Sequence, residues 1–355
     1  MFSLSPWIFA TENCNLRCPY CFEGHVNKNM SKEVWSATSE HFIQLVQDHV
    51  IRRTHWRISG GEPFMVFDTW REFPLYMKKV LGGNFNAGII SNFTLLNDEI
   101  VRYLVENNIG CGVSLDGTIH SKVDINGNST SKKVMENLEW FLDEGGRCNI
   151  LTVLTDTNVE TGEILDLAKF VVKHDLPWQV NSDIFVMLGN DYIEQMYQDV
   201  IEAIEYLTKS GYNMKKFSFQ FLRPCSSCTD GCQAGRRLLS IHTDGSIYPC
   251  QTCEGDPIAN IMTCDNIVNA LKRQTAYPIG YNYERPEACH PDRCTASFHC
   301  KGSCKLNMAP GDENPKCQLI RRIHQYFVSN GYYACLLYTS PSPRDRSVFR
   351  MPSSA

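Results

Sequence analysis

Three cysteines near the amino terminus have the spacing of a metal-cluster site. Cys14, Cys18 and Cys21 lie in one short segment, with three and then two residues between them. Three thiolates at this spacing can wrap one face of a [4Fe–4S] cubane and leave the fourth iron without a protein ligand. Zinc is the alternative, but structural zinc sites often use two CxxC pairs, and only Cys18 and Cys21 approach that form. The segment therefore favours an iron–sulfur cluster with one open iron.

A second group of cysteines lies near the carboxy terminus. Of the 17 cysteines, eleven fall between Cys225 and Cys317. A disulfide scaffold would explain such density in a short exported chain. This chain is long, and its start, MFSLSPWIFATEN, has neither the basic region nor the cleavage site of a secretory signal. We therefore expect a cytoplasmic protein whose clustered thiols bind metal, as iron–sulfur clusters or as zinc.

Composition excludes several other classes of protein. The 355 residues are 43% hydrophobic and 21% charged, and no run of eighteen apolar residues predicts a membrane span. Residues 335–355 contain CLLYTSPSPRD, which looks like a translated sequencing adapter, although a disordered tail is the alternative. Leaving out the three Arg and one Asp of that tail changes the net charge from −5 to −7. Such a chain has no basic field to bind nucleic acid.

The first two thirds of the chain predict six β-α units in tandem. Short apolar strands alternate with amphipathic helices, which implies parallel strands and right-handed crossovers. Six units are fewer than the eight of a closed TIM barrel, so we expect an α/β fold with a partial, TIM-like (β/α)6 barrel and an active site at the carboxyl ends of its strands. The expected strands are 7–11, 56–59, 87–90, 112–115, 149–153 and 178–184, and the expected helices are 32–47, 67–81, 98–107, 131–144, 160–174 and 192–209.

The pattern changes at about residue 217, where helical periodicity gives way to Gly, Pro and Cys. A hairpin is predicted from 239–242 and 247–249 around the turn Thr243-Asp244-Gly245-Ser246. The apolar content looks too low for a conventional core, so we expect metal clusters to stabilise this Cys-rich part, with a last helix near 318–328. The predicted divisions are a barrel domain at 1–212, a cluster domain at 213–334 and a non-native tail at 335–355.

The barrel motifs resemble the radical S-adenosylmethionine (SAM) superfamily. Its hallmark is a C-x3-C-x2-C loop after the first strand, as formed here by Cys14, Cys18 and Cys21. After the second strand, Ser59-Gly60-Gly61-Glu62-Pro63 resembles the family's GGEP element. The resemblance implies that SAM chelates the open iron and is cleaved reductively to a 5′-deoxyadenosyl radical. A low-potential donor such as flavodoxin or ferredoxin is then expected.

The same resemblance implies a SAM pocket at the strand ends. The glycines of the GGEP element would let the backbone approach the SAM amino group, and Glu62 would help to hold it. Family members commonly add an Arg that pairs with the SAM carboxylate, but this chain offers only Lys122, Lys132 and Lys133 after Gly117 and before Arg147. That contact is left unassigned. Further residues implied near the SAM ribose, carboxylate or adenine are Tyr20, Pro63, Ser91, Asn92, Ser114 and Asp116.

The carboxy-terminal cysteines resemble the SPASM domain. The pattern here is Cys232-x12-Gly245-x4-Cys250, Cys289-x4-Cys294-x5-Cys300-x3-Cys304 and Cys317, with one gap of four residues where two is usual. The resemblance implies two auxiliary [4Fe–4S] clusters. One would take Cys232, Cys250, Cys304 and either Cys225 or Cys228, and the other would take Cys289, Cys294, Cys300 and Cys317. We interpret Cys111, Cys148, Cys253 and Cys264 as thiols that bind no cluster.

SPASM enzymes are associated with oxidative chemistry on peptides. Sulfatase-maturating relatives carry an acidic general base directly after the second SPASM cysteine, where this chain has Gln251, although Asp244 or Glu254 could substitute. We therefore predict ribosomal-peptide maturation by thioether or carbon–carbon cross-linking. Formylglycine formation, small-molecule chemistry of cofactor biosynthesis, and a non-catalytic Fe–S or zinc protein are the alternatives. Because the first strand is expected within seven residues of Met1, any leader peptide is expected to bind the barrel, the SPASM surface or a separate leader-binding protein.

Overall fold

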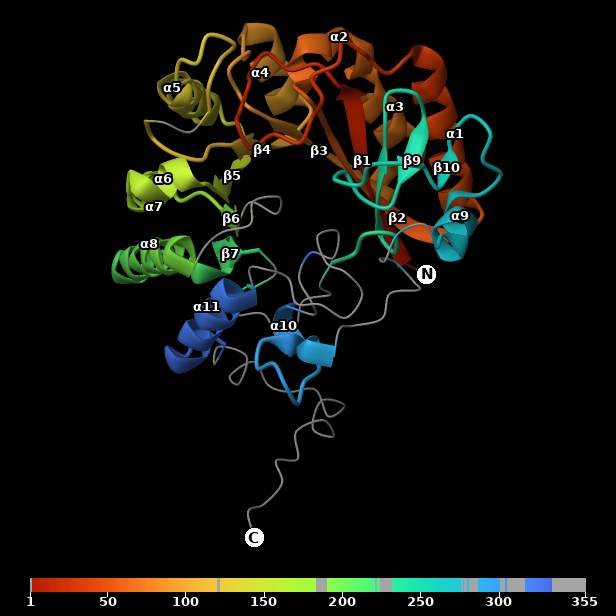
Figure 1. The fold of residues 1–355 in the computed structure, drawn as a ribbon. Helices are drawn as coiled ribbons and strands as arrows, with labels where there is room; N and C mark the ends of the chain where they lie inside the picture. The colour runs from red at the N-terminus through yellow and green to blue at the C-terminus, as the bar shows by residue number, and fades with distance from the viewer. Residues whose placement is uncertain are drawn as a thin grey trace.

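One curved sheet runs through the molecule. The computed structural model describes residues 2–119, 122–182, 190–220, 222–223, 232–275, 277, 280, 287–300, 304 and 317–333. Within these residues, ten strands are hydrogen-bonded in the order β10-β9-β8-β1-β2-β3-β4-β5-β6-β7. Figure 1 shows the strands as an arc with the helices on its outer side. The α/β class with a parallel sheet is confirmed.

The six predicted strands form the parallel centre of this sheet. Each pairs in parallel with the next, from β1 to β6. The pattern of β2 shows why, because Trp56 and Ile58 are fully buried against the helices while the alternate residues face the inside of the barrel. The bounds are β1 (Phe2–Thr11), β2 (Ile51–Gly60), β3 (Phe85–Ser91), β4 (Gly110–Ser114), β5 (Cys148–Leu154) and β6 (Trp178–Ser182).

A capping side chain, a proline and a glycine set the ends of several helices between these strands. The Asn97 side chain accepts a hydrogen bond from the Ile100 amide, so the expected N-cap is confirmed. Residues 67–81 form two helices because Pro74 has no N–H to bond the Trp70 carbonyl. Gly162, at φ 68°, separates α6 from α7. The bounds are α1 (Lys32–Gln47), α2 (Phe67–Trp70), α3 (Glu72–Leu81), α4 (Asp98–Glu106), α5 (Ser131–Asp143), α6 (Asp156–Glu160), α7 (Glu163–His174) and α8 (Asn190–Lys209).

The carboxy-terminal part extends the same sheet at both edges. β7 (Phe217–Phe219) pairs in parallel with β6, and β8 (Leu238–Ile241) pairs in parallel with β1. The predicted hairpin is confirmed, since β8 pairs antiparallel with β9 (Ser246–Tyr248), which in turn pairs with β10 (Ala259–Asn260). Sequence alone did not indicate that this hairpin would continue the barrel sheet. The proposed division at residue 212 therefore lies within one continuous sheet.

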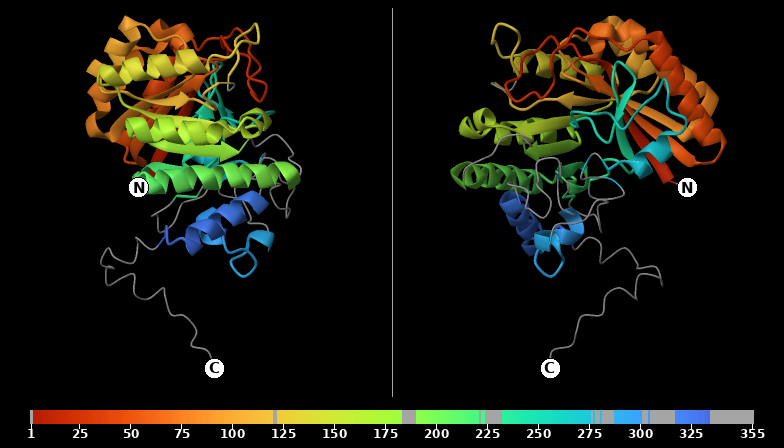
Figure 2. Two further views of the ribbon diagram at one scale, coloured as in Figure 1. Left: turned by 90° about the vertical axis from the view of Figure 1, so that its left-hand side faces the viewer. Right: turned by 45° about the vertical axis from the view of Figure 1, so that its right-hand side comes forward.

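Two expectations for this part need correction. Helical structure does not stop at residue 217, because α9 (Ile267–Arg273) is an amphipathic helix capped by Asn266. The apolar residues of β8, β9 and α9 also join the barrel's own hydrophobic core, so this region does not depend on clusters alone. The last helix is confirmed as α11 (Cys317–Ser329), which lies beside α8 in both views of Figure 2.

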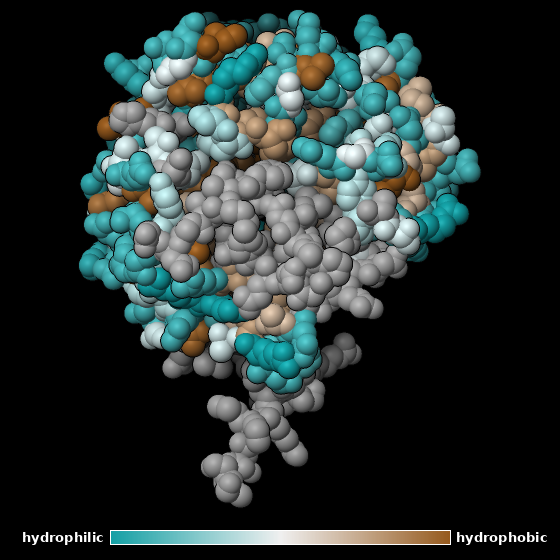
Figure 3. Space-filling model, viewed as in Figure 1, coloured by the Kyte–Doolittle hydropathy of each residue, from teal (hydrophilic) through white to brown (hydrophobic). Residues whose placement is uncertain are grey.

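The face in Figure 3 is mainly hydrophilic, with hydrophobic residues in small groups. Across the described ranges, no helix has both the length and the apolar character that crossing a membrane requires. The predicted non-native tail, 335–355, lies outside the described residues, as do residues 183 and 184 of the sixth expected strand.

Candidate active site

The three-cysteine loop lies at the carboxyl end of β1 and is held from two sides. The Arg17 amide donates to the Val123 carbonyl at 2.9 Å, which ties the loop to the segment after β4. The Asn15 amide side chain donates to Thr94 Oγ1 at 2.8 Å, which ties it to the segment after β3. Cys14, Cys18 and Cys21 are all half-buried. The loop is thus positioned by the ends of neighbouring parallel strands, where the fold predicts an active site.

Gly60 and Gly61 allow this loop to approach the end of β2. A Cβ atom on Gly60 would lie 2.0 Å from the Thr11 carbonyl oxygen, and one on Gly61 would lie 2.1 Å from that of Asn13. Gly60 also has φ 122°, a region that favours glycine. The amides of Gly61 and Glu62 donate to these same two carbonyls at 2.9 Å. The glycines therefore serve the cysteine loop directly, whatever they do for a bound ligand.

The Gly61→Ala variant should damage this contact. Its methyl group would meet rigid backbone, so the loop must shift, at a cost of about 1–3 kcal/mol in unfolding free energy. We expect lower iron content after anaerobic reconstitution and a lower melting temperature. Gly83→Ala is the matched control, because a Cβ there meets no atom within 4 Å. Equal iron content and melting temperature in the two variants would contradict the conclusion that Gly61 must lack a side chain for the cysteine loop to pack against β2.

Glu62 is completely buried and bonds the end of β3. Its Oε1 accepts from the Ser91 hydroxyl at 2.8 Å and the Phe64 amide at 3.0 Å, and its Oε2 accepts from the Asn92 amide at 2.8 Å. Burial raises the pKa of this carboxyl to about 7, although those three hydrogen bonds act in the opposite direction. A carboxylate has about four acceptor positions, so Oε2 keeps one for a ligand.

Ser91 and Asn92 are also occupied by protein partners. The Ser91 hydroxyl accepts from the Phe93 amide at 2.9 Å. The Asn92 side chain donates to Asn15 Oδ1 at 3.0 Å and lies 3.8 Å from Cys14 Sγ. Both residues are buried. Their visible role is to hold the cysteine loop and Glu62, and their predicted contacts with SAM stay a prediction.

Asp116, Tyr20 and Lys122 form a buried polar cluster beside the loop. The Tyr20 hydroxyl donates to Asp116 Oδ2, and Lys122 Nζ lies 3.1 Å from the same oxygen and 2.6 Å from the Tyr20 hydroxyl. Asp116 Oδ1 accepts from the Val153 amide at 2.8 Å. Burial alone would lower the pKa of Lys122, but Asp116 and Tyr20 outweigh it and raise that pKa well above its usual value.

Lys122 is the one of the three candidate lysines that reaches this site. Lys132 is exposed on α5, where it faces Glu136 at 3.8 Å, and Lys133 is exposed on the same helix. Ser114 lies half-buried at the end of β4, and the Pro63 carbonyl accepts from the Trp70 indole at 2.8 Å. Of the three lysines, Lys122 is therefore the one whose cation lies in the site, paired with Asp116.

The electrostatics of the three thiols fit a positively charged metal centre. The pKa of the Cys14 thiol is raised to about 11, mainly by burial and in smaller part by the charges of Glu62, Cys18 and Cys21. Grouped thiolates beside a buried carboxylate repel one another unless a cation compensates them. Among the described side chains, no three His, Cys, Asp or Glu converge as a single ion requires. A cubane instead binds each thiolate on a separate iron.

The carboxy-terminal cysteines are placed only in part. Cys225 and Cys228 lie outside the described residues. Cys250 and Cys253 are buried with their sulfurs 3.5 Å apart, and Cys232 packs against the same small cluster. Sequence reasoning left Cys253 out, although its CxxC spacing with Cys250 was a usable signal. Cys289, Cys294, Cys300 and Cys317 are buried, and Cys304 is half-buried.

Comparison with known proteins identifies the domain. Residues 8–168 match the Radical SAM superfamily. The cysteine-type anaerobic sulfatase-maturating enzyme of Clostridium novyi is 27% identical over 273 residues, which cover 68% of this chain and 71% of that enzyme. The enzyme of the same name from Clostridium perfringens is 23% identical over 332 residues, covering 83% and 87%.

Solved structures share the fold over most of the chain. Native anSMEcpe with bound AdoMet and the Cp18Cys peptide matches with a TM-score of 0.75 at 20% identity, over 94% of this chain and 99% of that one. SuiB of Streptococcus suis bound to the precursor peptide SuiA matches with a TM-score of 0.66 at 18% identity, over 89% and 76%. The chain therefore carries a radical SAM domain, and it is homologous to anaerobic sulfatase-maturating enzymes. A radical SAM domain implies a [4Fe–4S] cluster and SAM.

Proposed function

We propose that this chain is a radical SAM enzyme that oxidatively modifies a side chain of a peptide or protein. The observation that carries the proposal is the cysteine loop at the end of β1, fitted against Gly60 and Gly61 within the matched radical SAM domain. When bound, SAM on the open iron of the cluster supplies a 5′-deoxyadenosyl radical, which can abstract hydrogen from carbon. Peptides also occupy the related structures of anSMEcpe and SuiB.

The chain's own residues would prepare the site for SAM. Gly60 and Gly61 let the cysteine loop pack against the end of β2, and their predicted contact with SAM belongs to this proposal. Glu62 Oε2 keeps an acceptor position for an amino group. Lys122 has three N–H donors and directs two of them at Asp116 and Tyr20, so one is available for a carboxylate. The predicted contacts of Tyr20, Pro63, Ser91, Asn92, Ser114 and Asp116 with SAM belong to the same proposal.

We also propose the two auxiliary clusters in the Cys-rich part. The packing of Cys232 against Cys250 supports the first set, which would add Cys304 and one of Cys225 or Cys228. Cys289, Cys294, Cys300 and Cys317 would form the second. An electron donor such as flavodoxin or ferredoxin and a separate leader-binding protein stay predictions.

Two outcomes of peptide oxidation are supported by different observations. Gln251 follows Cys250 where an acidic base would stand, and its buried Oε1 has no hydrogen-bond partner among the described residues. An amide cannot accept a proton at neutral pH, which favours cross-linking. The named activity of the Clostridium relatives favours formylglycine formation.

A reconstitution experiment tests the function and separates the outcomes. Protein loaded anaerobically with iron and sulfide, reduced with dithionite and given SAM should release deoxyadenosine. With the Cp18Cys peptide, mass spectrometry should detect oxidation. Loss of two hydrogens with sulfur retained indicates cross-linking, and loss of sulfur indicates formylglycine. Deoxyadenosine without any change in peptides points to a small-molecule substrate, and its absence from well-loaded protein rejects the enzymatic function.

A further inference from the structure

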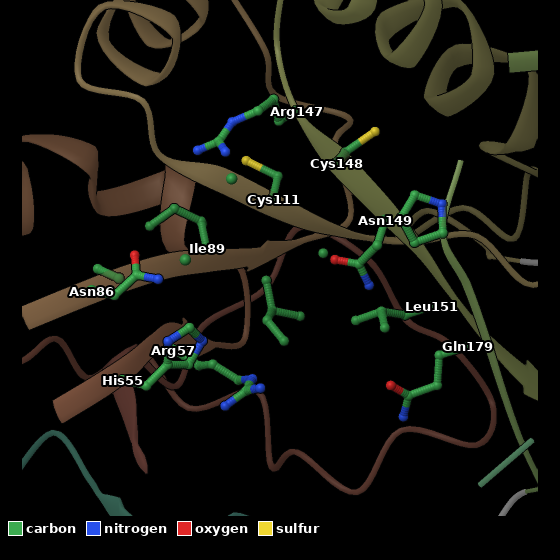
Figure 4. Close-up of a pocket in the computed structure, with 16 residues that line it drawn as sticks. His55, Arg57, Asn86, Ile89, Cys111, Arg147, Cys148, Asn149, Leu151 and Gln179 are labelled. Carbon is green, nitrogen blue, oxygen red and sulfur yellow. The ribbon is translucent and has the colours of Figure 1, made fainter. Parts of the chain in front are cut away.

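A cavity of about 340 Å³, lined by both polar and apolar residues, lies inside the barrel, toward the amino ends of its strands. It is distinct from the cysteine loop, since Arg57 on β2 precedes Glu62 by five residues. Figure 4 shows Arg57 and Gln179 reaching into the same space from opposite sides, with Asn149 between them along the wall. A cavity of this size can hold one or two amino-acid side chains.

Glycines create this space. Gly88, Gly110 and Gly112 line it on adjacent strands, where larger residues would fill the barrel. A Cβ on Gly112 would lie 2.8 Å from Leu151 Cδ1, and one on Gly88 would lie 3.2 Å from the Gly110 carbonyl oxygen. The opening is therefore built into two neighbouring strands, β3 and β4, rather than left by one poorly packed side chain.

The charge of the lining has one sign. None of the sixteen lining residues carries a carboxylate, whereas Arg57, Arg147 and His55 are basic. In the described part of the chain, no hydrogen bond or ion pair is made by the side chain of Arg57 or of nearby Arg223. Burial lowers the pKa of the Arg57 guanidinium, and the charge of the exposed Arg223 lowers it further. This arrangement occurs in a chain whose net charge is −5.

Uncompensated cations of this kind attract an anion. A concave wall of one sign focuses its field into the cavity, and a guanidinium can hold a carboxylate through two parallel hydrogen bonds. The amides of Asn86, Asn149 and Gln179 offer donors and acceptors that suit a peptide backbone. Aspartate or glutamate in a peptide meets both requirements.

We propose that this cavity selects peptide substrates with an acidic residue, whose carboxylate binds Arg57 with support from Arg223. The inference rests on the proposed function and specifies its substrate class. Five residues of extended chain span about 16 Å, for the strand and for a bound peptide alike. The acidic residue should therefore lie within about five residues of the side chain that is modified at the cluster end.

The test is selection from a random peptide pool. Acetylated, amidated peptides with random residues around a fixed cysteine are passed over immobilised, reconstituted full-length protein with SAM, and retained peptides are sequenced by mass spectrometry. Capped termini leave Asp and Glu as the only carboxylates. Wild-type protein should enrich Asp and Glu at least about tenfold, as expected for a charge-assisted hydrogen bond. Arg57→Gln should lose this enrichment, and Arg57→Lys should keep part of it.

Matched variants keep the test decisive. Arg52→Gln removes the same charge from an exposed position of β2 outside the cavity and should enrich like wild type. If Arg57→Gln does not fold, Arg223→Gln, an exposed position, should show the same loss. Absence of acidic enrichment in wild type, or its persistence in a folded Arg57→Gln protein, overturns the proposal. Selection needs no turnover, so acidic enrichment in protein that releases no deoxyadenosine would reject the proposed function, while absence of enrichment in protein that releases deoxyadenosine would overturn only this inference.

Discussion

The Cys18→Ala variant should release deoxyadenosine at least about a hundredfold more slowly than wild type when reduced with dithionite in the presence of SAM. Losing a residue that only supports the ligands of a metal site already lowers metal affinity or activity about 10–100-fold. Cys18 is itself assigned as a ligand, so its loss should cost at least as much. Its thiol lies between Cys14 and Cys21 in the loop that β1, β2 and β3 position. Without it, the remaining thiols can hold only two irons of a cubane.

The measurement combines the amount of deoxyadenosine released with the iron content of the protein. Deoxyadenosine is quantified by chromatography, and iron per chain should fall by about four, the content of one cubane. Cys264→Ala is the matched control, because Cys264 is a half-buried thiol outside every assigned ligand set. It should keep the wild-type iron content. Wild-type deoxyadenosine release by Cys18→Ala would reject the assignment of the cysteine loop as the SAM-binding cluster site.

The Lys122→Met variant should lose about 3 kcal/mol of unfolding free energy, the lower end of the cost of breaking a buried ion pair. Asp116 is 1% exposed and Lys122 is 8% exposed, with Nζ and Oδ2 3.1 Å apart. Removing the lysine leaves the Asp116 carboxylate in a buried site with only hydrogen bonds to compensate it. Denaturation in urea, followed by tryptophan fluorescence, measures the change.

Two further variants make this prediction specific. Lys132→Met removes an exposed lysine 3.8 Å from Glu136 and should change the free energy by no more than about 0.5 kcal/mol. Adding Asp116→Asn to Lys122→Met should recover part of the loss, because the uncompensated charge is then gone. If Lys122→Met costs no more than Lys132→Met, the buried pair does not contribute as its geometry indicates.

The sequence by itself determined the order of the β-α units and the cysteine loop. Strand and helix periodicities, N-caps such as Asn97 and the spacing of Cys14, Cys18 and Cys21 are local properties, fixed by side-chain direction and covalent distance. Because parallel strands end at one edge, the motifs after β1, β2 and β4 could be expected to meet there. This is why the radical SAM domain could be recognised before any contact was known.

Other features required the tertiary structure. Sequence offered three lysines, and only packing across β4 and the cysteine loop placed Lys122 against Asp116 and Tyr20. Only the fold showed that β8 joins β1, or that Gly61 must lack a side chain because Asn13 lies against it. The cationic cavity around Arg57 likewise depends on several strands at once. Such contacts join residues far apart in the chain, and their energies depend on burial and neighbours that local spacing does not specify.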